Sequence, residues 1–320
     1  MSAEADFITL MREMATHPGA RGLADDAAVL DVAAGQLVLT HDMLVEGIHF
    51  LPDDPADSVA WKLVAVNMSD LAAKGAKPLG VLLGFSLAGD SEWGRVFSVG
   101  LGEALAHFGV PLLGGDTVAI PSGAPRALGL TAIGKAPATG APSRSGANPG
   151  DLLLVSGPIG DAGAGLAIAR GSLAAAGEAR AALVEAYRRP VPDLELGAAL
   201  APLVTAMADI SDGLLIDAGR MGQASDCGIE VDLDAIPLSQ AFAALRGDGV
   251  DSRLAAAAAG DDYCLLFAVS PSRQGEIESF GLSLTAVGRC VKGEGLALFS
   301  NGVAVPLPAR LGFEHGMPGA

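Results

Sequence analysis

Residues 67–78, with the sequence NMSDLAAKGAKP, constrain the fold of this chain most, because they close a helical pattern that begins near Asp57. Gly75, with a proline three residues later, marks the end of the helix. Apolar side chains recur at helical spacing and predict a buried stripe, and Asp70 lies near that stripe. A carboxylate beside the core must be paired, neutral or bound to a cation. The simpler alternative is an exposed ion pair with Lys74, worth about 0.3–0.5 kcal/mol, and the helix alone leaves both interpretations open.

The composition predicts a globular protein of two domains. With 320 residues the chain exceeds one ordinary core, and half of its residues are apolar. Its formal net charge of −17 disfavours nucleic acid and anionic membranes as partners. The first residues have neither the basic nor the apolar segment of a signal peptide, and no apolar run is long enough to span a membrane. We therefore expect a soluble, cytoplasmic protein.

Apolar runs with strand character alternate with helical patterns along the whole chain, so we expect an α/β (α+β) protein. A Pro/Gly/Ser-rich connector at 136–149 suggests the domain boundary. We therefore expect an N-terminal domain at 1–137 and a C-terminal domain at 138–320. Strands are expected at 36–40 and 110–113, each followed at once by a polar or glycine-rich segment, and one helix is expected over 194–207.

Aspartates recur where the predicted apolar runs end. Ligands collect at strand ends in α/β sheets, although each acid taken singly is explained better as a turn residue. Gathered in one cleft, such carboxylates would repel one another unless cations neutralised them. Mg²⁺ usually takes one or two carboxylates while it bridges substrate phosphates, so it would let an acidic protein bind ATP. The six aspartates are Asp26, Asp42, Asp70, Asp116, Asp209 and Asp212.

Other common nucleotide and hydrolase motifs find no support. The segment 129–135 matches GxxxxGK, but Ala136 follows where a phosphate-binding loop has Ser or Thr, and the connector follows where a helix is required. Residues 160–165 have the spacing GxxGxG, which reverses the dinucleotide-binding motif. The chain has no GxSxG, HExxH or CxxC motif, so neither a serine hydrolase nor a zinc site is indicated.

Seven short motifs, in order along nearly the whole chain, resemble those of the thiamine-monophosphate kinase family. They are DDAAVL at 25–30, THDMLVEGIHF at 40–50, NMSDLAAKGAKP at 67–78, GGDT at 114–117, SRSGANPGD at 143–151, ISDGL at 210–214 and GDDY at 260–263. The resemblance implies a two-domain fold like that of aminoimidazole ribonucleotide synthetase, which belongs to the same superfamily. It also implies a cytoplasmic kinase of thiamine biosynthesis that converts thiamine monophosphate to thiamine diphosphate. In-line transfer would use ATP as co-substrate on several Mg²⁺ ions, in a homodimer joined through the sheets of two N-terminal domains.

The same resemblance assigns roles residue by residue. The expected metal ligands are Asp26, Thr40, His41, Asp42, Asp70, Asp116, Asp209 and Asp212, with backbone oxygen as the donor considered for Thr40 and His41. The acids expected to take part in catalysis are Asp70, Asp116, Asp209 and Asp212. The residues expected to contact ATP are Phe108, Gly115, Asp116, Arg144 and Ser211, with Arg144 on phosphate. Those expected to contact thiamine monophosphate are His49, Asp261 and Phe313, although core packing explains Phe313 equally well.

Three positions depart from the family pattern: Ala24 replaces Gly, Lys74 replaces Met, and Asp261 replaces a Glu of longer reach. Two alternatives to the kinase remain. One is an ATP-dependent synthetase or selenophosphate-forming enzyme of the same superfamily, and the latter expects a reactive cysteine near the N-terminus, where residues 1–30 contain none. The other is a non-catalytic nucleotide-binding or maturation factor of the same fold, which would bind ATP without turnover.

Overall fold

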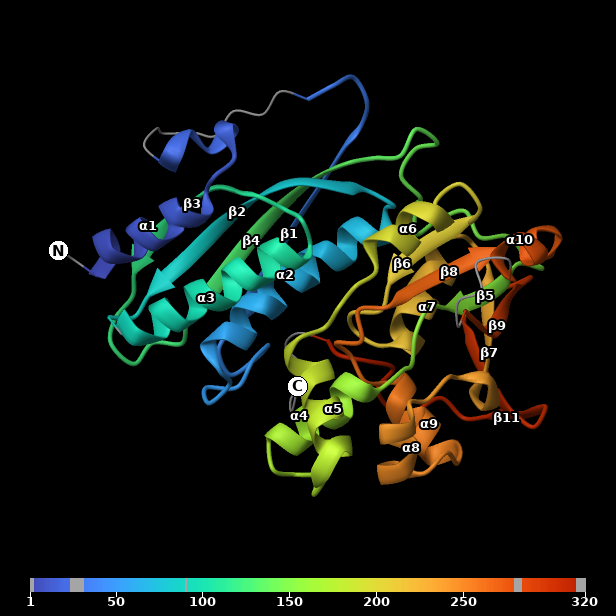
Figure 1. Ribbon diagram of the computed structural model, residues 1–320. Helices are drawn as coiled ribbons and strands as arrows, with labels where there is room; N and C mark the ends of the chain where they lie inside the picture. Colours follow the sequence, from blue (N-terminus) through green and yellow to red (C-terminus); the bar gives the residue numbers. More distant parts are fainter. Residues whose placement is uncertain (1–2, 24–31, 90, 279–283, 315–320) are drawn as a thin grey trace. The chain divides into compact units, whose positions relative to one another are not determined.

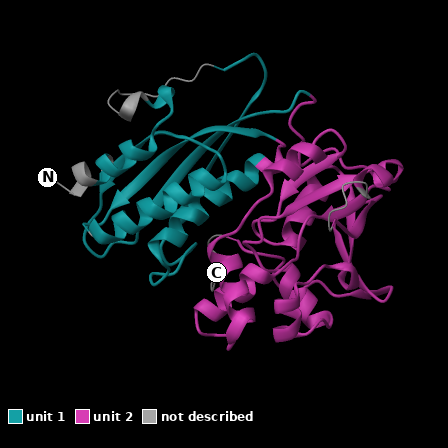
Figure 2. Cartoon of the chain, in the orientation of Figure 1, with its two compact units in different colours: residues 1–71, 76–138 teal, residues 72–75, 139–320 magenta. Residues whose placement is uncertain are grey.

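The computed structural model describes residues 3–23, 32–89, 91–278 and 284–314, and the chain divides into two compact units (Figures 1 and 2). The first unit comprises residues 1–71 and 76–138, and the second comprises residues 72–75 and 139–320. Each unit has its own sheet, so the fold is the mixed α/β, two-domain arrangement that the sequence predicts. The roles expected of residues 1–137 and 138–320 stay predictions.

The first unit contains a four-stranded sheet with the strand order β1-β4-β2-β3. Strand β2 pairs with β3 in parallel, and the other two pairs are antiparallel. In chain order its elements are α1 (Ala3–Met14), the 3-10 helix η1 (Pro18–Leu23), β1 (Leu37–Val45), α2 (Ala56–Ala73), β2 (Lys77–Leu87), α3 (Ser91–His107), β3 (Leu112–Ala119) and β4 (Ala127–Lys135).

Helices α2 and α3 cover one face of this sheet (Figure 1). Alternate strand residues such as Leu83 and Leu130 are buried on that face, because side chains on a strand point to opposite faces in turn. Phe85 of β2 joins the layers, since its ring lies 5.1 Å from that of Phe97 in α3 and stacks at 4.0 Å on that of Phe7 in α1. Helix α2 is almost wholly buried along its length, which is why it holds the first unit together.

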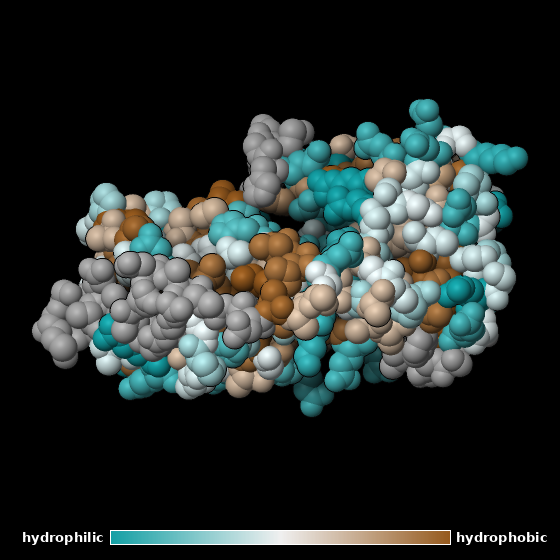
Figure 3. All heavy atoms as spheres, turned by 90° about the horizontal axis from the view of Figure 1, so that it is seen from above, coloured by the Kyte–Doolittle hydropathy of each residue, from teal (hydrophilic) through white to brown (hydrophobic). Residues whose placement is uncertain are grey.

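The other face of the sheet is open among the described residues. Residues 37, 39, 41 and 43 of β1 point to this face and are exposed, with Leu39 at 65% and Met43 at 49%. Val118 on β3 is also exposed, at 54%. Figure 3, which views the molecule from above, shows hydrophobic side chains gathered on this part of the surface. Large apolar side chains on one exposed sheet face are typical of an interaction surface.

Two strands extend further than the sequence predicts. β1 continues to Val45 and pairs with β4 along its whole length, so Thr40, His41 and Asp42 lie inside the strand and not at its end. β3 likewise continues through Asp116 to Ala119. Both are edge strands, and an edge strand with one open face tolerates polar residues that a central strand would exclude. The expectation that these aspartates follow strand ends was therefore wrong.

The second unit contains a seven-stranded sheet with the order β11-β10-β7-β9-β5-β8-β6, in which only β10 and β7 pair in parallel among the described residues. Its elements begin with β5 (Leu152–Val155), α4 (Asp161–Ala169), α5 (Gly177–Arg188), α6 (Leu194–Leu200), β6 (Ala206–Asp209), α7 (Leu214–Ala224), β7 (Gly228–Asp232) and η2 (Leu233–Ala235). They continue with α8 (Gln240–Arg246), α9 (Val250–Ala257), β8 (Leu265–Val269), η3 (Pro271–Arg273), α10 (Gln274–Glu278), β9 (Thr285–Val291), β10 (Leu296–Ser300) and β11 (Val303–Val305).

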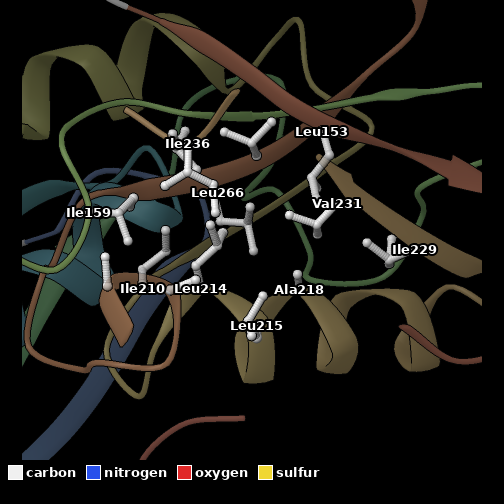
Figure 4. Packing of buried hydrophobic residues seen from close by; sticks show 14 of the residues in the cluster. Leu153, Ile159, Ile210, Leu214, Leu215, Ala218, Ile229, Val231, Ile236 and Leu266 are labelled. Carbon is white, nitrogen blue, oxygen red and sulfur yellow. The ribbon is translucent and has the colours of Figure 1, made fainter. Parts of the chain in front are cut away.

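Helix α7 packs on this sheet and anchors its core. Figure 4 shows Leu214, Leu215 and Ala218 of α7 opposite sheet residues that include Val231 and Leu266, and all of these are fully buried. The prediction of a single helix over 194–207 was wrong. Helix α6 ends at Leu200, and the next element is the short strand β6, which begins at Ala206. Pro202 lies between the two and cannot continue a helix without losing a backbone hydrogen bond.

The described helices include none that is both long and apolar enough to cross a membrane. The three cysteines are free, and Cys227 and Cys290 are buried as small hydrophobic residues, as expected. Cys264 is half-buried.

Candidate functional site

Strand β1 and helix α2 bring three of the expected metal-binding residues together in the first unit. The hydroxyl of Thr40 donates a hydrogen bond to Asp70 Oδ2. Two residues along the strand, the backbone N–H of Asp42 donates to Asn67 Oδ1 at 3.2 Å, and Asn67 lies three residues before Asp70. Residues two apart in a strand lie on one face of the strand, and residues three apart in a helix lie on one face of the helix. Thr40 and Asp42 therefore lie opposite Asn67 and Asp70.

Asn67 fixes this arrangement from inside the core. Its side chain is fully buried, and its amide nitrogen donates to the backbone oxygen of Leu63 at 3.0 Å within the same helix. Asp70 is half-buried. Lys74 Nζ donates to the backbone oxygen of Met207 at 3.3 Å, so Asp70 and Lys74 each have a partner of their own. The surface ion pair between them therefore loses its support.

His41 and Asp116 are placed differently from Asp42. The His41 side chain points to the open face of the sheet, where its Nδ1 lies 2.8 Å from the hydroxyl of Thr131. The His41 side chain therefore points away from the face on which the Asp42 side chain lies, and contact of the His41 backbone oxygen with a metal stays a prediction. Asp116 lies on β3, with β4 and β2 between it and β1, which corresponds to roughly 14 Å at the usual strand spacing. The sheet therefore does not bring Asp116 beside Asp42.

Two residues expected to contact ATP have clear structural roles in the first unit. A Cβ added to Gly115 would overlap the backbone oxygen of Leu83, so the close approach of β2 to β3 requires a glycine there. Phe108 is 8% exposed, and its ring lies 5.8 Å from that of Trp61 and edge-on to that of His107 at 4.8 Å. Contact of either residue with a nucleotide stays a prediction.

His49 lies in the turn after β1 with its ring orientation fixed. The backbone N–H of Val45 donates to His49 Nδ1 at 3.0 Å, so neutral His49 carries its proton on Nε2. The amine of Lys62, which is 2% exposed, donates to the backbone oxygen of His49 at 3.3 Å. Lys62 precedes Asp70 by eight residues in α2, about 12 Å along the helix axis.

In the second unit, a turn at residues 211–213 joins β6 to α7 and carries two expected site residues, Ser211 and Asp212. Asp217 Oδ2 accepts hydrogen bonds from the backbone N–H groups of residues 211, 212 and 213 at 3.1–3.2 Å. Arg220 Nη1 donates to Asp212 Oδ2 and, at 2.9 Å, to Asp217 Oδ1. Burial of the Asp217 carboxyl raises its pKa, and the charge of Asp212 adds to the rise.

The same turn holds the expected substrate residues through the backbone. The N–H of Asp261 donates to the oxygen of Ser211 at 2.8 Å, and the N–H of Phe313 donates to the oxygen of Asp212 at 2.8 Å. The hydroxyl of Tyr263 donates to Asp261 Oδ1 at 3.0 Å. Asp261 and Tyr263 have φ values of +70° and +48°, a left-handed conformation that non-glycine residues adopt at a cost and that recurs at functional sites.

Between these two residues, Asp262 ties the segment to helix α4. Both of its carboxylate oxygens accept from the backbone N–H of Gly160, at 2.9 and 3.0 Å, at the start of the helix. Burial raises the pKa of the Asp262 carboxyl well above its ordinary value, in spite of this hydrogen bond. The segment that carries Asp261 is thus fixed at Ser211 and at α4.

The remaining expected residues of the second unit flank β6. Asp209 ends this strand and is 5% exposed. Arg144 lies in an exposed loop that is fixed on both sides, because the N–H of Met207 donates to the oxygen of Ser143 at 2.8 Å and the N–H of Gly146 donates to Ser225 Oγ at 3.1 Å. Asp26 and Ala24 lie outside the described residues.

Carboxylate and hydroxyl oxygens are the ligands that Mg²⁺ prefers, and the side chains of Thr40, Asp42 and Asp70 supply only these. Within the part of the chain that the structure describes, no three His, Cys, Asp or Glu side chains are close enough to hold a metal by themselves. Mg²⁺ completes its coordination with water and phosphate oxygens, so one or two carboxylates suffice. The residues present therefore fit Mg²⁺ bound together with a polyphosphate.

Sequence reasoning missed the polar residues that support the expected site residues: Asp217, Arg220, Lys62 and Tyr263. The spacing of three between Asp217 and Arg220 indicates a contact within a helix, but it does not show that the carboxylate also reaches back to the turn before α7. That contact depends on the conformation of the turn.

Comparisons with known proteins agree with the motifs. Residues 24–136 match the family model for the N-terminal domain of AIR synthase related proteins, and residues 148–301 match the model for the C-terminal domain. The chain is 40% identical over 309 residues to the thiamine-monophosphate kinase of Caulobacter vibrioides. The aligned part covers 93% of this chain and 86% of the relative.

Solved structures give the same result. The thiamine-monophosphate kinase of Stenotrophomonas maltophilia K279a superposes with a TM-score of 0.81 at 35% identity, over 95% of this chain and 97% of that chain. AaThiL, solved in complex with AMPPCP and TMP, gives a TM-score of 0.76 at 28% identity, over 89% of each chain. Sequence identity and fold agree over both units, and the chain therefore belongs to the thiamine-monophosphate kinase family of AIR synthase related proteins.

Proposed function

We propose that this protein is an ATP-dependent kinase that phosphorylates thiamine monophosphate to thiamine diphosphate. The observation that carries the proposal is the pairing of Thr40 with Asp70 and of Asp42 with Asn67, which puts oxygen ligands from two family motifs on one surface of the first unit. Membership of the family supports it, because a relative at 40% identity is a thiamine-monophosphate kinase and AaThiL was solved with AMPPCP and TMP.

The reaction would be a direct transfer of the γ-phosphoryl group of ATP to the phosphate of thiamine monophosphate, without a phosphorylated enzyme. Phosphoryl transfer needs positioning and charge neutralisation more than covalent chemistry from the protein. Mg²⁺, in several ions, would supply positive charge at the phosphates, which the net charge of −17 otherwise repels. In the first unit Asp42 and Asp70 would hold Mg²⁺, and in the second unit Asp209 and Asp212 would do so.

Other side chains would bind and orient the two substrates. Arg144 would donate to phosphate oxygens of ATP, since a guanidinium suits a bidentate contact with phosphate. His49 would donate from Nε2 to thiamine monophosphate, because its Nδ1 already accepts from Val45. Lys62 holds the turn that carries His49 and lies about 12 Å from Asp70 along α2. An extended substrate would therefore reach from His49 toward Asp70.

The protein would act as a homodimer in the cytoplasm. The open face of the first unit's sheet carries Leu39 and Met43 on one edge strand, each about half exposed or more, and Val118 on the opposite edge strand. A second copy of the same face would bury these side chains, and each buried CH₂ group contributes about 0.8 kcal/mol. The formal charge makes nucleic acid and anionic membranes unsuitable partners.

The test is an assay of ADP release by the purified protein with and without thiamine monophosphate, over a range of Mg²⁺ concentrations. We expect ADP release that requires both, with thiamine diphosphate formed in equal amount. ADP release that ignores thiamine monophosphate would favour another ATP-dependent enzyme of the superfamily. Binding of ATP without any turnover would favour a nucleotide-binding factor.

A further inference from the structure

The carboxylate of Asp217 holds the turn at residues 211–213, and none of the functional roles described so far includes this residue. Asp217 is fully buried, and its Oδ2 accepts three successive backbone N–H groups, those of Ser211, Asp212 and Gly213. Removing a carboxylate from water is costly unless its oxygens are paired. The second oxygen, Oδ1, is also paired, with Arg220 at 2.9 Å.

Arg220 connects this buried carboxylate to Asp212. One nitrogen, Nη1, donates to both Asp217 Oδ1 and Asp212 Oδ2. The Arg220 and Asp212 side chains are 36% and 30% exposed, whereas that of Asp217 is fully buried. Asp217 therefore fixes the backbone of the turn directly and the direction of the Asp212 carboxylate through Arg220.

The location of Asp217 in α7 makes it a rigid support. It lies in the first turn of the helix and reaches back past its start, as the second residue of a capping box does, but it contacts three N–H groups where a capping box contacts one. Neighbouring residues Leu214, Leu215 and Ala218 are fully buried against the sheet (Figure 4). The helix cannot move without disrupting this core.

We propose that Asp217 is a positioning residue for phosphoryl transfer, which presets the turn at residues 211–213 and, with Arg220, orients Asp212 toward the magnesium–nucleotide complex. The inference rests on the proposed function and adds residues that neither the motifs nor the family comparison assigns. Residues that orient ligands in this way typically change metal affinity or activity by about 10- to 100-fold when they are removed.

The test compares Asp217→Asn and Arg220→Met with the wild-type protein. Asn keeps the shape of the side chain but places an N–H₂ group where an oxygen acceptor is needed. Arg220→Lys serves as the rescue variant. In the wild type one nitrogen of Arg220, Nη1, contacts both Asp212 and Asp217, and the single amine of Lys can replace it. Asp193→Asn is the matched control: Asp193 accepts one backbone N–H at the start of α6, from Leu196 at 2.8 Å, in the same unit.

Two measurements are made on each folded variant: the Mg²⁺ concentration for half-maximal ADP release, and the binding of a non-hydrolysable ATP analogue with Mg²⁺ by calorimetry. We expect Asp217→Asn and Arg220→Met to need about tenfold or more Mg²⁺ and to bind the analogue correspondingly more weakly. In Arg220→Met the KM for thiamine monophosphate should stay within about twofold, because this change acts only on the direction of the Asp212 carboxylate. Asp217→Asn also loosens the turn that holds Asp261 and Phe313, so it should raise this KM as well. Arg220→Lys and Asp193→Asn should remain close to the wild type.

Unchanged Mg²⁺ dependence and unchanged analogue binding in both Asp217→Asn and Arg220→Met would overturn the inference, even if melting temperature falls, because Asp217 would then be only a stabilising cap. If Asp217→Asn does not fold, the decision rests on Arg220→Met, whose side chain is partly exposed. The wild-type assay separates this result from failure of the proposed function, because analogue binding can be measured without turnover.

Discussion

The Thr40 hydroxyl, from the middle of β1, donates a hydrogen bond to the Asp70 carboxylate on α2. This contact joins two motifs thirty residues apart and turns one carboxylate oxygen of Asp70 toward the sheet. The other carboxylate oxygen can then take a different ligand. We interpret Asp70 as the central acid of the first unit for this reason.

Asp70→Asn should lower turnover by at least about 100-fold while the melting temperature changes little, because the amide keeps the Thr40 contact but loses the charge that holds a cation. ADP release and thermal unfolding measure the two effects. Asp53→Asn, at an exposed position in the loop before α2, is the control and should behave as the wild type. Retained activity with reduced stability would make Asp70 a structural residue.

Thr40→Val should lower turnover about 10- to 100-fold, since it keeps the shape of the side chain but removes the hydroxyl that orients Asp70. The half-saturating Mg²⁺ concentration should rise at the same time. Thr40→Ser restores the hydroxyl and should recover most of the activity. Equal activity of the valine and serine variants would show that the hydrogen bond has no part in catalysis.

Gly115→Ala should destabilise the first unit by about 1–3 kcal/mol, because the added methyl group would overlap the backbone oxygen of Leu83. Gly114→Ala is the matched control: its Cβ would lie 3.4 Å from a flexible Leu82 methyl group, which can move. Urea unfolding of both variants gives the comparison. Equal stability would contradict the close approach of β2 and β3 as the reason for glycine at 115.

Asp262 should make stability depend on pH. Its pKa is raised in the folded protein, so the folded state binds more protons than the unfolded state. Its contribution is therefore fully present below the unfolded pKa, about 3.9, and is lost as the pH rises through the folded pKa. Urea unfolding from pH 4 upward should show the wild type losing stability relative to Asp262→Asn.

Asp248→Asn, at an exposed position in the same unit, is the control for this series and should run parallel to the wild type. A constant difference in unfolding free energy between the wild type and Asp262→Asn at every pH would contradict the raised pKa.

Leu39→Glu should convert the proposed dimer to a monomer, because a carboxylate would be buried between two copies of the open sheet face. Light scattering coupled to size-exclusion chromatography measures the mass directly. Val191→Glu is the control, since Val191 is 61% exposed, close to the 65% of Leu39, but lies in the second unit. A wild-type monomer, or a Leu39→Glu dimer of unchanged stability, would remove the support for this interface.

Local sequence was enough to predict several elements and the family. The apolar spacing and Gly75 predicted the helix that is observed as Ala56–Ala73, and Gly75 has the left-handed φ of +58° that suits a helix end. The continuous apolar run at residues 79–87 indicates a buried strand, which is observed as β2 (Lys77–Leu87), and seven ordered motifs identified the family. These features depend on neighbours within a few residues, which the sequence shows directly.

The geometry of the site required the tertiary structure. Strand alternation separates Thr40 and Asp42, which face α2, from His41, which faces away, but only if all three lie within a strand, and the sequence predicted the strand to end at residue 40. Pairing of β1 with β4, about 90 residues later, extends the strand through them. The separation of Asp116 from Asp42 likewise depends on the strand order. The role of Asp217 depends on a turn that places three N–H groups around one oxygen. The sequence thus determined which acids the protein carries, whereas strand register and turn conformation, which arise from contacts distant along the chain, decided which of them meet.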